Sequence, residues 1–380
     1  MMLAHALRRA VPTGYLRASA SGARVASRGI VTLPDGSKQF EKVLIANRGE
    51  ISCRVIESCQ KLGIKTVAIY SEPDAESKHV KMADEAYCVG PAPSLQSYLN
   101  IDKVIEVIKE SGAEAVHPGY GFLSENRDFA NALKDIGVEF VGPDAEAIWS
   151  MGDKIMSMRI AQEAGVSCAP RYDGEVADVD HALELAEDIG YPVIMKASAG
   201  GGGKGMRVAW TPEELADGFR LAREEAKASF DDDRMLLQHF VCPTDGRHIE
   251  IQIIADKHGN VACFPERECS IQRRKQKVIE ESPSVLLTEE TRLKMQQQAA
   301  DLCQKVGYHC AGTVEFLADN DQNFYFLEMN TRLQVEHPVS EEVSGEDLVE
   351  LMLSVAAGNK LPERLRHAEG SEEFKTKRCT

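Results

Sequence analysis

The chain has 380 residues, 43% of them hydrophobic, and a formal net charge of −16. This length predicts two or three domains with a sizeable core, and so acidic a body argues against general nucleic-acid binding. No apolar run approaches 18 residues, so no membrane span is predicted. The ten cysteines form no C-x-x-C pair, which favours reduced, mostly buried thiols over a zinc site.

Residues 1–38 differ from the rest of the chain. They contain five arginines and several serines, and no acidic residue precedes Asp35. This composition is typical of a mitochondrial transit peptide, because the apolar core of a secretion signal is missing. A disordered basic tail is the alternative interpretation. We therefore expect the mature chain in the mitochondrial matrix.

Residues 40–150 alternate short apolar runs with amphipathic stretches. Strands are predicted near 42–46, 65–70, 86–90, 114–122 and 138–143, with helices between them. Such alternation indicates a parallel α/β domain. The first crossover carries Asn47, Arg48 and Gly49 where an NAD-binding fold would have G-x-G-x-x-G, so a Rossmann NAD site is not predicted.

Two further regions follow, at 151–234 and 235–360. The first has two strands around a glycine run and a charged helix from Pro212 to about Ser229. The second has antiparallel signals: a hairpin at 248–267, and another at 312–330 with a polar turn at 320–323. The last segment, 361–380, is a polar tail with no clear period.

The glycine run at 200–205 is the first candidate for chemistry. It matches G-x-G-x-x-G, but it fails as a Walker A loop because Lys204 is followed by glycine. Since it lies between two predicted strands, we interpret it as a hairpin flap whose backbone N–H groups close over a polyphosphate. Lys204 and Lys196 would supply positive charge there. A disordered surface turn is the alternative.

Glu315, Glu328 and Asn330 are the second candidate. The two glutamates lie on paired strands of one predicted hairpin, so they could share a site. Two carboxylates and an amide oxygen suit Mg²⁺ or Mn²⁺, which also bridge ATP phosphates. The alternative is a pair of ordinary exposed strand carboxylates.

The segment from Glu328 to Glu336 is the third candidate. If it is extended, period two puts alternate polar side chains on one face. Arg332 would bind an anion in bidentate fashion, and Glu336 would serve as a carboxylate base. A solvated polar face is the ordinary alternative.

A basic cluster inside the acidic body is the fourth candidate. It comprises Arg273, Arg274, Lys275 and Lys277. Beside an ATP site it would bind small anions, although a basic surface patch would have the same composition.

Several long motifs in order now point to a known family. They are HPGYGFLSEN at 117–126, MGDK at 151–154, KASAGGGGKGM at 196–206, RHIEIQ at 247–252, ERECSIQRRKQKVIEE at 266–281 and EMNTRLQVEHPV at 328–339. From about Phe40 to Gly358 the chain resembles biotin carboxylase of the ATP-grasp superfamily, and the propionyl-CoA carboxylases most of all. The resemblance implies an α/β fold: a parallel N-terminal domain followed by an ATP-grasp fold with a mobile lid.

The resemblance also implies roles for individual residues. ATP would contact Lys154, Lys196, His248 and, in the flap, Gly202, Gly203 and Lys204. The metal ions would bind Glu315, Glu328 and Asn330. Bicarbonate would be held by Lys277, Arg332, Gln334 and Val335, with Glu336 as its general base.

The implied activity is ATP-dependent carboxylation of biotin with bicarbonate through carboxyphosphate, within an acyl-CoA carboxylase. Biotin would arrive on a carrier domain of another chain or segment, because no A-M-K-M attachment motif is present. A carboxyltransferase β subunit and an oligomeric assembly are the implied partners. The chain departs from the family in having Gln238 and His239 where Glu-Lys is usual, and in largely lacking the family's C-terminal domain.

Two other interpretations remain open. Another ATP-grasp ligase, joining a carboxylate to an amine, would share the flap and the metal-binding glutamates, but it would not need the QRRKQK and RLQVEHP segments. A truncated, non-catalytic subunit that binds ATP without turnover would account for the short C-terminal part.

Overall fold

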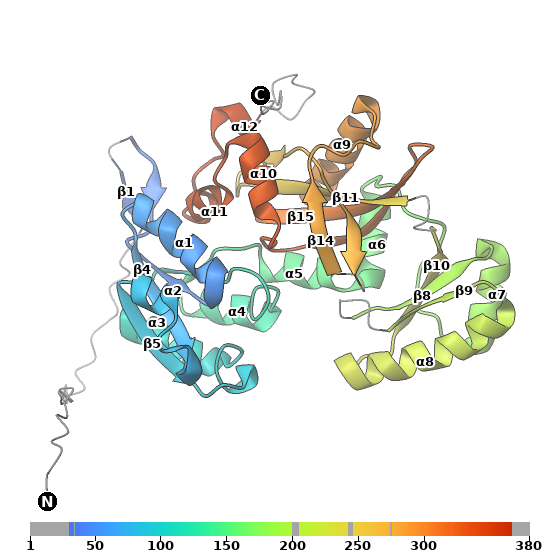
Figure 1. The fold of residues 1–380 in the computed structure, drawn as a ribbon, viewed down its shortest axis with the longest axis horizontal. Coiled ribbons are helices and arrows are strands. Elements are labelled where there is room, and N and C mark those ends of the chain that lie inside the picture. Colours follow the sequence, from blue (N-terminus) through green and yellow to red (C-terminus); the bar gives the residue numbers. More distant parts are fainter. Residues whose placement is uncertain (1–29, 34, 200–204, 242–245, 274–275, 367–380) are drawn as a thin grey trace, which may run out of the picture.

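A computed structural model describes residues 30–33, 35–199, 205–241, 246–273 and 276–366. These residues form three parts arranged side by side, with the small sheet at the right and the N-terminal domain at the left of Figure 1. Within the described residues, no helix has both the length and the apolar character needed to cross a membrane.

The N-terminal domain contains a five-stranded parallel sheet in the order β5-β4-β3-β6-β7, which confirms the predicted α/β class. Its strands are β3 (Lys42–Ile45), β4 (Lys65–Ser71), β5 (Glu85–Gly90), β6 (Ala115–His117) and β7 (Glu139–Phe140). Its helices are α1 (Gly49–Lys61), α2 (Lys78–Met82), α3 (Ile101–Ser111) and α4 (Arg127–Asp135), with single 3-10 turns at Glu72–Asp74 and Ser94–Gln96. The central strands are apolar and buried on both faces, as a parallel sheet between helices requires.

A small hairpin of β1 (Val31–Thr32) and β2 (Lys38–Gln39) precedes this domain. It lies within the segment 1–38 that the sequence assigns to a transit peptide. The β2 backbone is tied to the C-terminal part of the fold, because the Asn359 side chain bonds both the N–H and the C=O of Lys38 at 2.8 and 2.7 Å. The last residues of the 1–38 segment are therefore part of the folded body, whereas residues 1–29 lie outside the described part.

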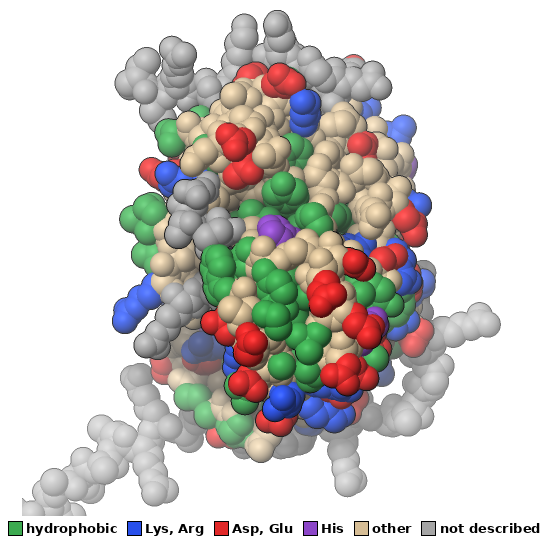
Figure 2. All heavy atoms as spheres, turned by 90° about the vertical axis from the view of Figure 1, so that its right-hand side faces the viewer, with side chains coloured by type: hydrophobic (Ala, Val, Ile, Leu, Met, Phe, Trp, Pro, Cys, Tyr) green, Lys and Arg blue, Asp and Glu red, His purple; other side chains and the backbone are tan. Residues whose placement is uncertain are grey.

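The small sheet, which we call the lid sheet, has the order β10-β8-β9 and is antiparallel. It consists of β8 (Val193–Ala197), β9 (Met206–Ala209) and β10 (Met235–His239), and it packs on α7 (Val179–Ile189) and α8 (Pro212–Phe230). Strand β10 belongs here by pairing with β8, so this subdomain extends past the boundary at 234 expected from the sequence. Figure 2 views the molecule from this side and shows acidic side chains interspersed with hydrophobic ones on its surface.

The large sheet is antiparallel, in the order β14-β13-β11-β15-β16, with β12 paired to β11. Its strands are β11 (Gly246–Ala255), β12 (Val261–Cys263), β13 (Arg267–Arg273), β14 (Gln276–Glu281), β15 (Cys310–Asp319) and β16 (Phe324–Asn330). The hairpins β11–β12 and β15–β16 are the two that the sequence predicts. The remaining helices are α5 (Ala145–Gly152), α6 (Lys154–Glu163), α9 (Glu289–Lys305), α10 (His337–Ser344), α11 (Leu348–Ala356) and α12 (Glu363–Arg366).

The large sheet has two chemically different faces. On β11 the side chains of Ile249, Ile251 and Ile253 join a core beneath α5, α6 and α9. Because side chains alternate along a strand, His248, Glu250 and Gln252 point to the opposite face. That face is polar yet buried, and it carries the candidate site.

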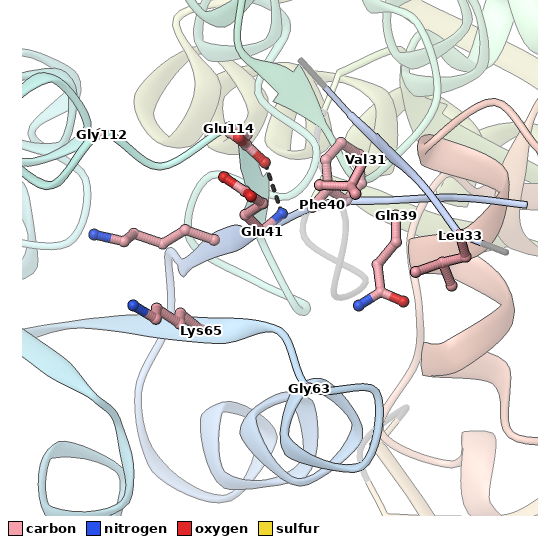
Figure 3. A pocket seen from close by; sticks show the side chains of 10 residues that line it. Val31, Leu33, Gln39, Phe40, Glu41, Gly63, Lys65, Gly112 and Glu114 are labelled. Carbon is pink, nitrogen blue, oxygen red and sulfur yellow. Dashed lines mark hydrogen bonds between the residues drawn. The ribbon is translucent and has the colours of Figure 1, made fainter. Parts of the chain in front are cut away.

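One cavity lies away from this face. It has a volume of about 340 Å³ and is lined by residues at the amino ends of β3 and β4 and by the β1–β2 hairpin. There the Glu41 amide donates to the Glu114 carboxylate at 2.7 Å (Figure 3). None of the site residues predicted from the sequence is among its lining residues.

Candidate active site

A row of charged residues crosses the polar face of the large sheet. Glu250 is the register partner of Arg267 on one side and of Glu315 on the other, and Glu315 is in turn the partner of Glu328. The row therefore runs through β13, β11, β15 and β16. Directly opposed residues on antiparallel strands have Cβ atoms about 4.5–5.5 Å apart, so these side chains must interact. The two glutamates of the predicted hairpin thus lie on one face, as expected.

Arg267 anchors one end of the row. Its side chain is 0% exposed, and its guanidinium donates to Glu250 at 2.6 Å and to Gln334 at 2.7 Å. It also donates to the side chains of Gln252 at 2.9 Å and Ser340 at 2.7 Å. A fully buried guanidinium is tolerated only when its N–H groups are satisfied in this way. Arg267 therefore joins β11, β13 and α10 into one unit.

Lys277 on β14 lies among three carboxylates. Its Nζ atom is 2.9 Å from Glu315 and 2.7 Å from Glu336, and it also contacts Glu250. Burial alone would lower the pKa of Lys277, but the three acids raise it well above its usual range. In return, Lys277 lowers the pKa of Glu336 against the effect of burial. Glu336 is thereby kept as a carboxylate beside a fixed cation.

Glu315 and Glu328 differ in their surroundings. Burial works against ionisation of Glu315, but His248 and Lys277 hold its pKa below the ordinary value. The pKa of Glu328 is raised, first by burial and then by the charge of Glu315. The Glu328 side chain makes no hydrogen bond or ion pair with any residue that the structure describes. A second carboxylate held there is suited to share a divalent cation with Glu315.

Asn330 completes the proposed metal-binding set. Its amide nitrogen donates to Glu315 at 2.7 Å, while its oxygen accepts from Arg332 at 3.1 Å. Both carboxylates and an amide oxygen thus gather at the end of the β15–β16 hairpin. They fit a hard divalent cation by their chemistry.

His248 lies next to this set. Its Nε2 atom is 2.7 Å from Glu315 Oε2, within ion-pair distance, but it forms no hydrogen bond in the described part of the chain. Burial disfavours the imidazolium form, but the carboxylate outweighs it and raises the pKa of His248. A buried nitrogen with an unused donor is available to a ligand bound at this face.

Arg332 faces a different acid. Its Nε atom donates to Glu125 at 3.0 Å, and the same carboxylate accepts from the Thr331 amide at 3.2 Å. Glu125 belongs to the loop after β6, in the HPGYGFLSEN motif. The N-terminal domain therefore contributes a side chain that orients Arg332 beside Asn330.

The chain after β16 turns instead of remaining extended. The strand ends at Asn330, and α10 begins at His337 with Pro338 in its first turn. Leu333 is buried in the core, whereas Val335 is 59% exposed. Gln334 nevertheless donates to Glu315 at 2.9 Å. The His337 ring donates from Nδ1 to the Gln334 carbonyl at 2.7 Å, and this bond fixes the turn before Glu336.

The lid sheet is tied to the large sheet through Asp153. This residue caps α6 by accepting from the Met156 amide at 2.9 Å, and it accepts from Ser198 at 2.9 Å. The Lys154 amide donates to the Ser198 carbonyl at 3.0 Å. Burial and Glu315 raise the pKa of Glu328, and the charges of Lys154 and Lys196 offset part of that rise. Two lysines are thus held close to the proposed metal ligands.

The structure brings most of the predicted residues together but does not cover all of them. The flap residues Gly202, Gly203 and Lys204 lie outside the described residues, as do Arg274 and Lys275 of the basic cluster. Of the two described members of that cluster, Arg273 is exposed and Lys277 reaches the site. Sequence reasoning missed Glu125, Glu250 and Arg267. Glu250 had a usable signal, because it alternates with isoleucines along a strand and is the one carboxylate between two apolar neighbours there.

Comparison with known proteins gives consistent matches. Residues 39–148 match the family model "Biotin carboxylase, N-terminal domain", and residues 153–364 match "Carbamoyl-phosphate synthase L chain, ATP binding domain". The chain is 59% identical to the human mitochondrial propionyl-CoA carboxylase alpha chain over 333 residues, covering 88% of this chain and 46% of that protein. It is 51% identical to Bacillus subtilis biotin carboxylase 1, covering 85% of this chain and 71% of that protein.

Solved structures agree with these matches. The Campylobacter jejuni biotin carboxylase, in complex with β,γ-ATP, superposes with a TM-score of 0.83 at 46% identity, over 85% of this chain and 72% of that one. The biotin carboxylase domain of Hydrogenobacter thermophilus 2-oxoglutarate carboxylase, in complex with magnesium ADP and bicarbonate, superposes with a TM-score of 0.82 at 49% identity. The match covers 85% of this chain and 71% of that one. The chain spans about half the length of the propionyl-CoA carboxylase alpha chains that it matches.

Proposed function

This chain belongs to the biotin carboxylase family, and from that premise we propose that it carboxylates biotin with bicarbonate in a reaction driven by ATP. The observation that carries the proposal is the group Glu336–Lys277–Glu315. It combines an ionised carboxylate, a fixed cation and a metal-binding acid within contact distance. Such a group can activate an anion next to a metal-bound phosphate.

We assign the base to Glu336. Its carboxylate takes the proton of bicarbonate, and the freed oxygen attacks the γ-phosphorus of ATP, so that the bond to ADP breaks. The resulting carboxyphosphate divides into CO₂ and phosphate. A ureido nitrogen of biotin then gives its proton to the released phosphate and takes up the CO₂. Since Lys277 lowers the pKa of Glu336, the carboxylate is available as a base at neutral pH.

Bicarbonate would be held on the side of Glu336 that faces Lys277. Arg332 and the Gln334 amide supply further donors, and the backbone of Val335 contributes from the turn. Arg332 is kept in place by Glu125 and Asn330. A guanidinium and an ammonium group together suit a small planar anion, because they offset its charge and fix its plane.

ATP would lie between the lid sheet and the large sheet. Lys154, Lys196 and His248 are the described residues that would contact it, with Gly202, Gly203 and Lys204 proposed on sequence grounds. Mg²⁺ or Mn²⁺ would be held by Glu315, Glu328 and Asn330. The metal would supply charge neutralisation at the phosphates. The relatives in complex with magnesium ADP or β,γ-ATP support this placement.

The wider assignment follows from the named relatives. Mitochondrial propionyl-CoA carboxylase alpha chains are among the most similar proteins, which supports a role in an acyl-CoA carboxylase of the mitochondrial matrix. Biotin would then be presented by a carrier domain, and a carboxyltransferase β subunit would use the carboxybiotin. The dimer of the Hydrogenobacter domain supports an oligomeric assembly.

The direct test is ADP release by the purified chain with MgATP, bicarbonate and free biotin. We expect biotin-stimulated turnover, and a loss of about 10²–10⁴-fold in the Glu336→Gln variant, because general-base catalysis contributes about that factor. Glu342→Gln, an exposed position on the same helix, is the matched control and should retain full turnover. Turnover that survives Glu336→Gln would defeat the base assignment, and no biotin-stimulated turnover in any variant would defeat the proposed activity.

A further inference from the structure

A buried thiol lies on the polar face of the large sheet, and the proposed reaction does not use it. Cys269 on β13 is 0% exposed. It follows Arg267 by two positions, so the alternation of side chains along the strand puts both on the same face. Burial raises the pKa of the Cys269 thiol, and the charge of Glu250 raises it further. In the free chain the group is therefore a neutral thiol among charged side chains.

This thiol forms a compact group with two carboxylates. One ligand atom from each of Glu250, Cys269 and Glu336 lies within 4.8 Å of the other two. Around a tetrahedral ion with bonds of about 2.0–2.3 Å, neighbouring ligand atoms are roughly 3–4 Å apart, so a small inward movement would enclose a metal. The three residues come from β11, β13 and the turn before α10. The spacing of cysteines along the sequence therefore gives no sign of the group.

The charge at this place favours a divalent cation. Three carboxylates surround Lys277, and one of them is also paired with Arg267. Three negative and two positive groups leave one net negative charge. A divalent ion that displaces the thiol proton of Cys269 adds one net positive charge, which makes the cluster neutral. Charges held away from water are least costly when they are balanced in this way.

The thiol decides which ion the group selects. Mg²⁺ is a hard ion that takes oxygen ligands, so it would remain with the carboxylates and the amide at the end of the β15–β16 hairpin. Zn²⁺ is softer and binds thiolate sulfur at about 2.3 Å. Metal binding deprotonates a coordinating thiol even where its surroundings favour the neutral form. The sulfur of Cys269 therefore separates a zinc site from the proposed magnesium site.

We propose that Glu250, Cys269 and Glu336 form a zinc site, and that zinc bound there inhibits the chain. Binding replaces the S–H bond of Cys269 by a sulfur–zinc bond, and the proton passes to solvent. Lys277, whose side chain is 18% exposed, turns outward to admit the ion. Because zinc then occupies the Glu336 carboxylate, that group no longer takes the proton of bicarbonate. The inhibition rests on the proposed function, whereas the binding does not.

The first test measures binding to the full chain after a chelator has removed bound metal. Calorimetric titration with Zn²⁺ should show a site that excess Mg²⁺ does not block. Cys269→Ser should weaken that site by at least about tenfold, because even an indirect partner of a metal ligand contributes about 10–100-fold to affinity. Co²⁺ in place of Zn²⁺ should give a sulfur-to-cobalt charge-transfer band in the near ultraviolet, which Cys269→Ser should remove. Cys88→Ser, at an exposed thiol of β5, is the matched control and should keep both signals.

The second test measures inhibition. Zinc should suppress the biotin-stimulated release of ADP by the unaltered chain. Cys269→Ser should need at least about ten times more zinc to halve its own zinc-free rate, in line with its weaker binding. If thermal unfolding shows that Cys269→Ser is not folded, Glu336→Gln provides the second variant, since it removes a ligand outside the strands. Its zinc affinity, measured by calorimetry, should fall by a similar factor.

Three results separate the possible outcomes. A cobalt band of equal strength in the unaltered chain and in Cys269→Ser would overturn the inference and leave the proposed function intact. Zinc binding that requires His248 but not Cys269 would also overturn it, because the ion would then lie on the neighbouring group of His248, Glu250 and Glu315. Absence of biotin-stimulated turnover without zinc would defeat the proposed function, and the calorimetric and cobalt measurements would still decide whether the zinc site exists.

Discussion

The polar face of the large sheet and the inner face of the lid sheet are organised in opposite ways. On the large sheet, Arg267 and Lys277 are each bonded to several side chains, and the acids around them are correspondingly fixed. On the lid sheet, the buried Oε1 atom of Gln238 has no hydrogen-bond partner among the described residues. The difference suggests that the two sheets have different roles. Around Arg267 and Lys277 the large sheet holds its side chains in place before any ligand arrives, whereas the lid sheet leaves a buried amide oxygen for a ligand to satisfy.

Replacing Arg267 should have the largest effect on stability. Arg267→Met removes the cation that Glu250 depends on, and breaking a buried ion pair from one side costs about 3–5 kcal/mol of unfolding free energy. Urea unfolding measures this as a lower transition midpoint. Arg220→Met, at an exposed site on α8, should leave the midpoint unchanged. A midpoint for Arg267→Met equal to that of the unaltered chain would show that the row is not a stabilising unit.

Replacing Lys277 should have the largest effect on activity among these variants. Lys277→Met leaves Glu250, Glu315 and Glu336 without their shared cation, so the pKa of Glu336 should rise and the base should become partly protonated. We expect turnover to fall by about 10²–10³-fold, the usual result of removing one electrostatic contact at a reacting centre. Lys294→Met on α9 is the control, since that ammonium pairs only at the surface. A loss below tenfold would contradict the central role of Lys277.

Two buried histidines should make stability depend on pH. Burial lowers the pKa of His117 to about 3 and that of His337 to about 4, below the ordinary value of about 6.5 for an unfolded chain. Below pH 6.5 the unfolded chain binds protons that the folded chain does not. The stability gained by keeping these histidines neutral is therefore complete above pH 6.5, and it declines as the pH falls toward their pKa values in the folded chain. In that window each histidine should lower the free energy of unfolding by about 1.4 kcal/mol per pH unit.

Urea unfolding at pH 7.5, 6.0 and 5.0 checks this dependence. His337→Asn should flatten the profile between pH 6.5 and 5, because an asparagine does not titrate and can still donate to the Gln334 carbonyl. His258→Asn, at an exposed position between β11 and β12, is the matched control. Equal slopes for all three proteins would show that His337 is not held neutral by the fold.

Neutralising Glu328 should have the smallest effect on the free protein. Glu328→Gln removes a like charge opposite Glu315, so the ligand-free chain should gain up to about 1 kcal/mol of unfolding free energy. The added stability that MgATP gives should be lost at the same time, because a metal ligand is missing. Thermal unfolding with and without MgATP separates the two effects. A variant that is less stable alone but still stabilised by MgATP would exclude Glu328 from the metal site.

The sequence predicted the parts of the site that depend on local register. Glu315 and Glu328 could be paired in advance because the polar turn at 320–323 fixes which residues of the two strands face each other. The approach of Lys277 to Glu336 was expected only from the family resemblance and not from local register, since it depends on how the β13–β14 hairpin lies against the turn before α10. The segment from Glu328 to Glu336, predicted as extended, leaves the strand at Asn330, because Leu333 joins the core and the helix starts at His337. Glu250 and Arg267 were missed because the charge of each is neutralised by the other, and their pairing across two strands is visible only in the fold.

The most direct test of the account is the fate of oxygen from bicarbonate labelled with ¹⁸O. If Glu336 directs bicarbonate onto the γ-phosphorus, the attacking oxygen remains on phosphorus when carboxyphosphate divides. Each phosphate released in the presence of biotin should then carry one ¹⁸O atom, as measured by mass spectrometry. Phosphate that carries only oxygen from ATP and unlabelled water would contradict the proposed reaction, because it would show hydrolysis without activation of bicarbonate.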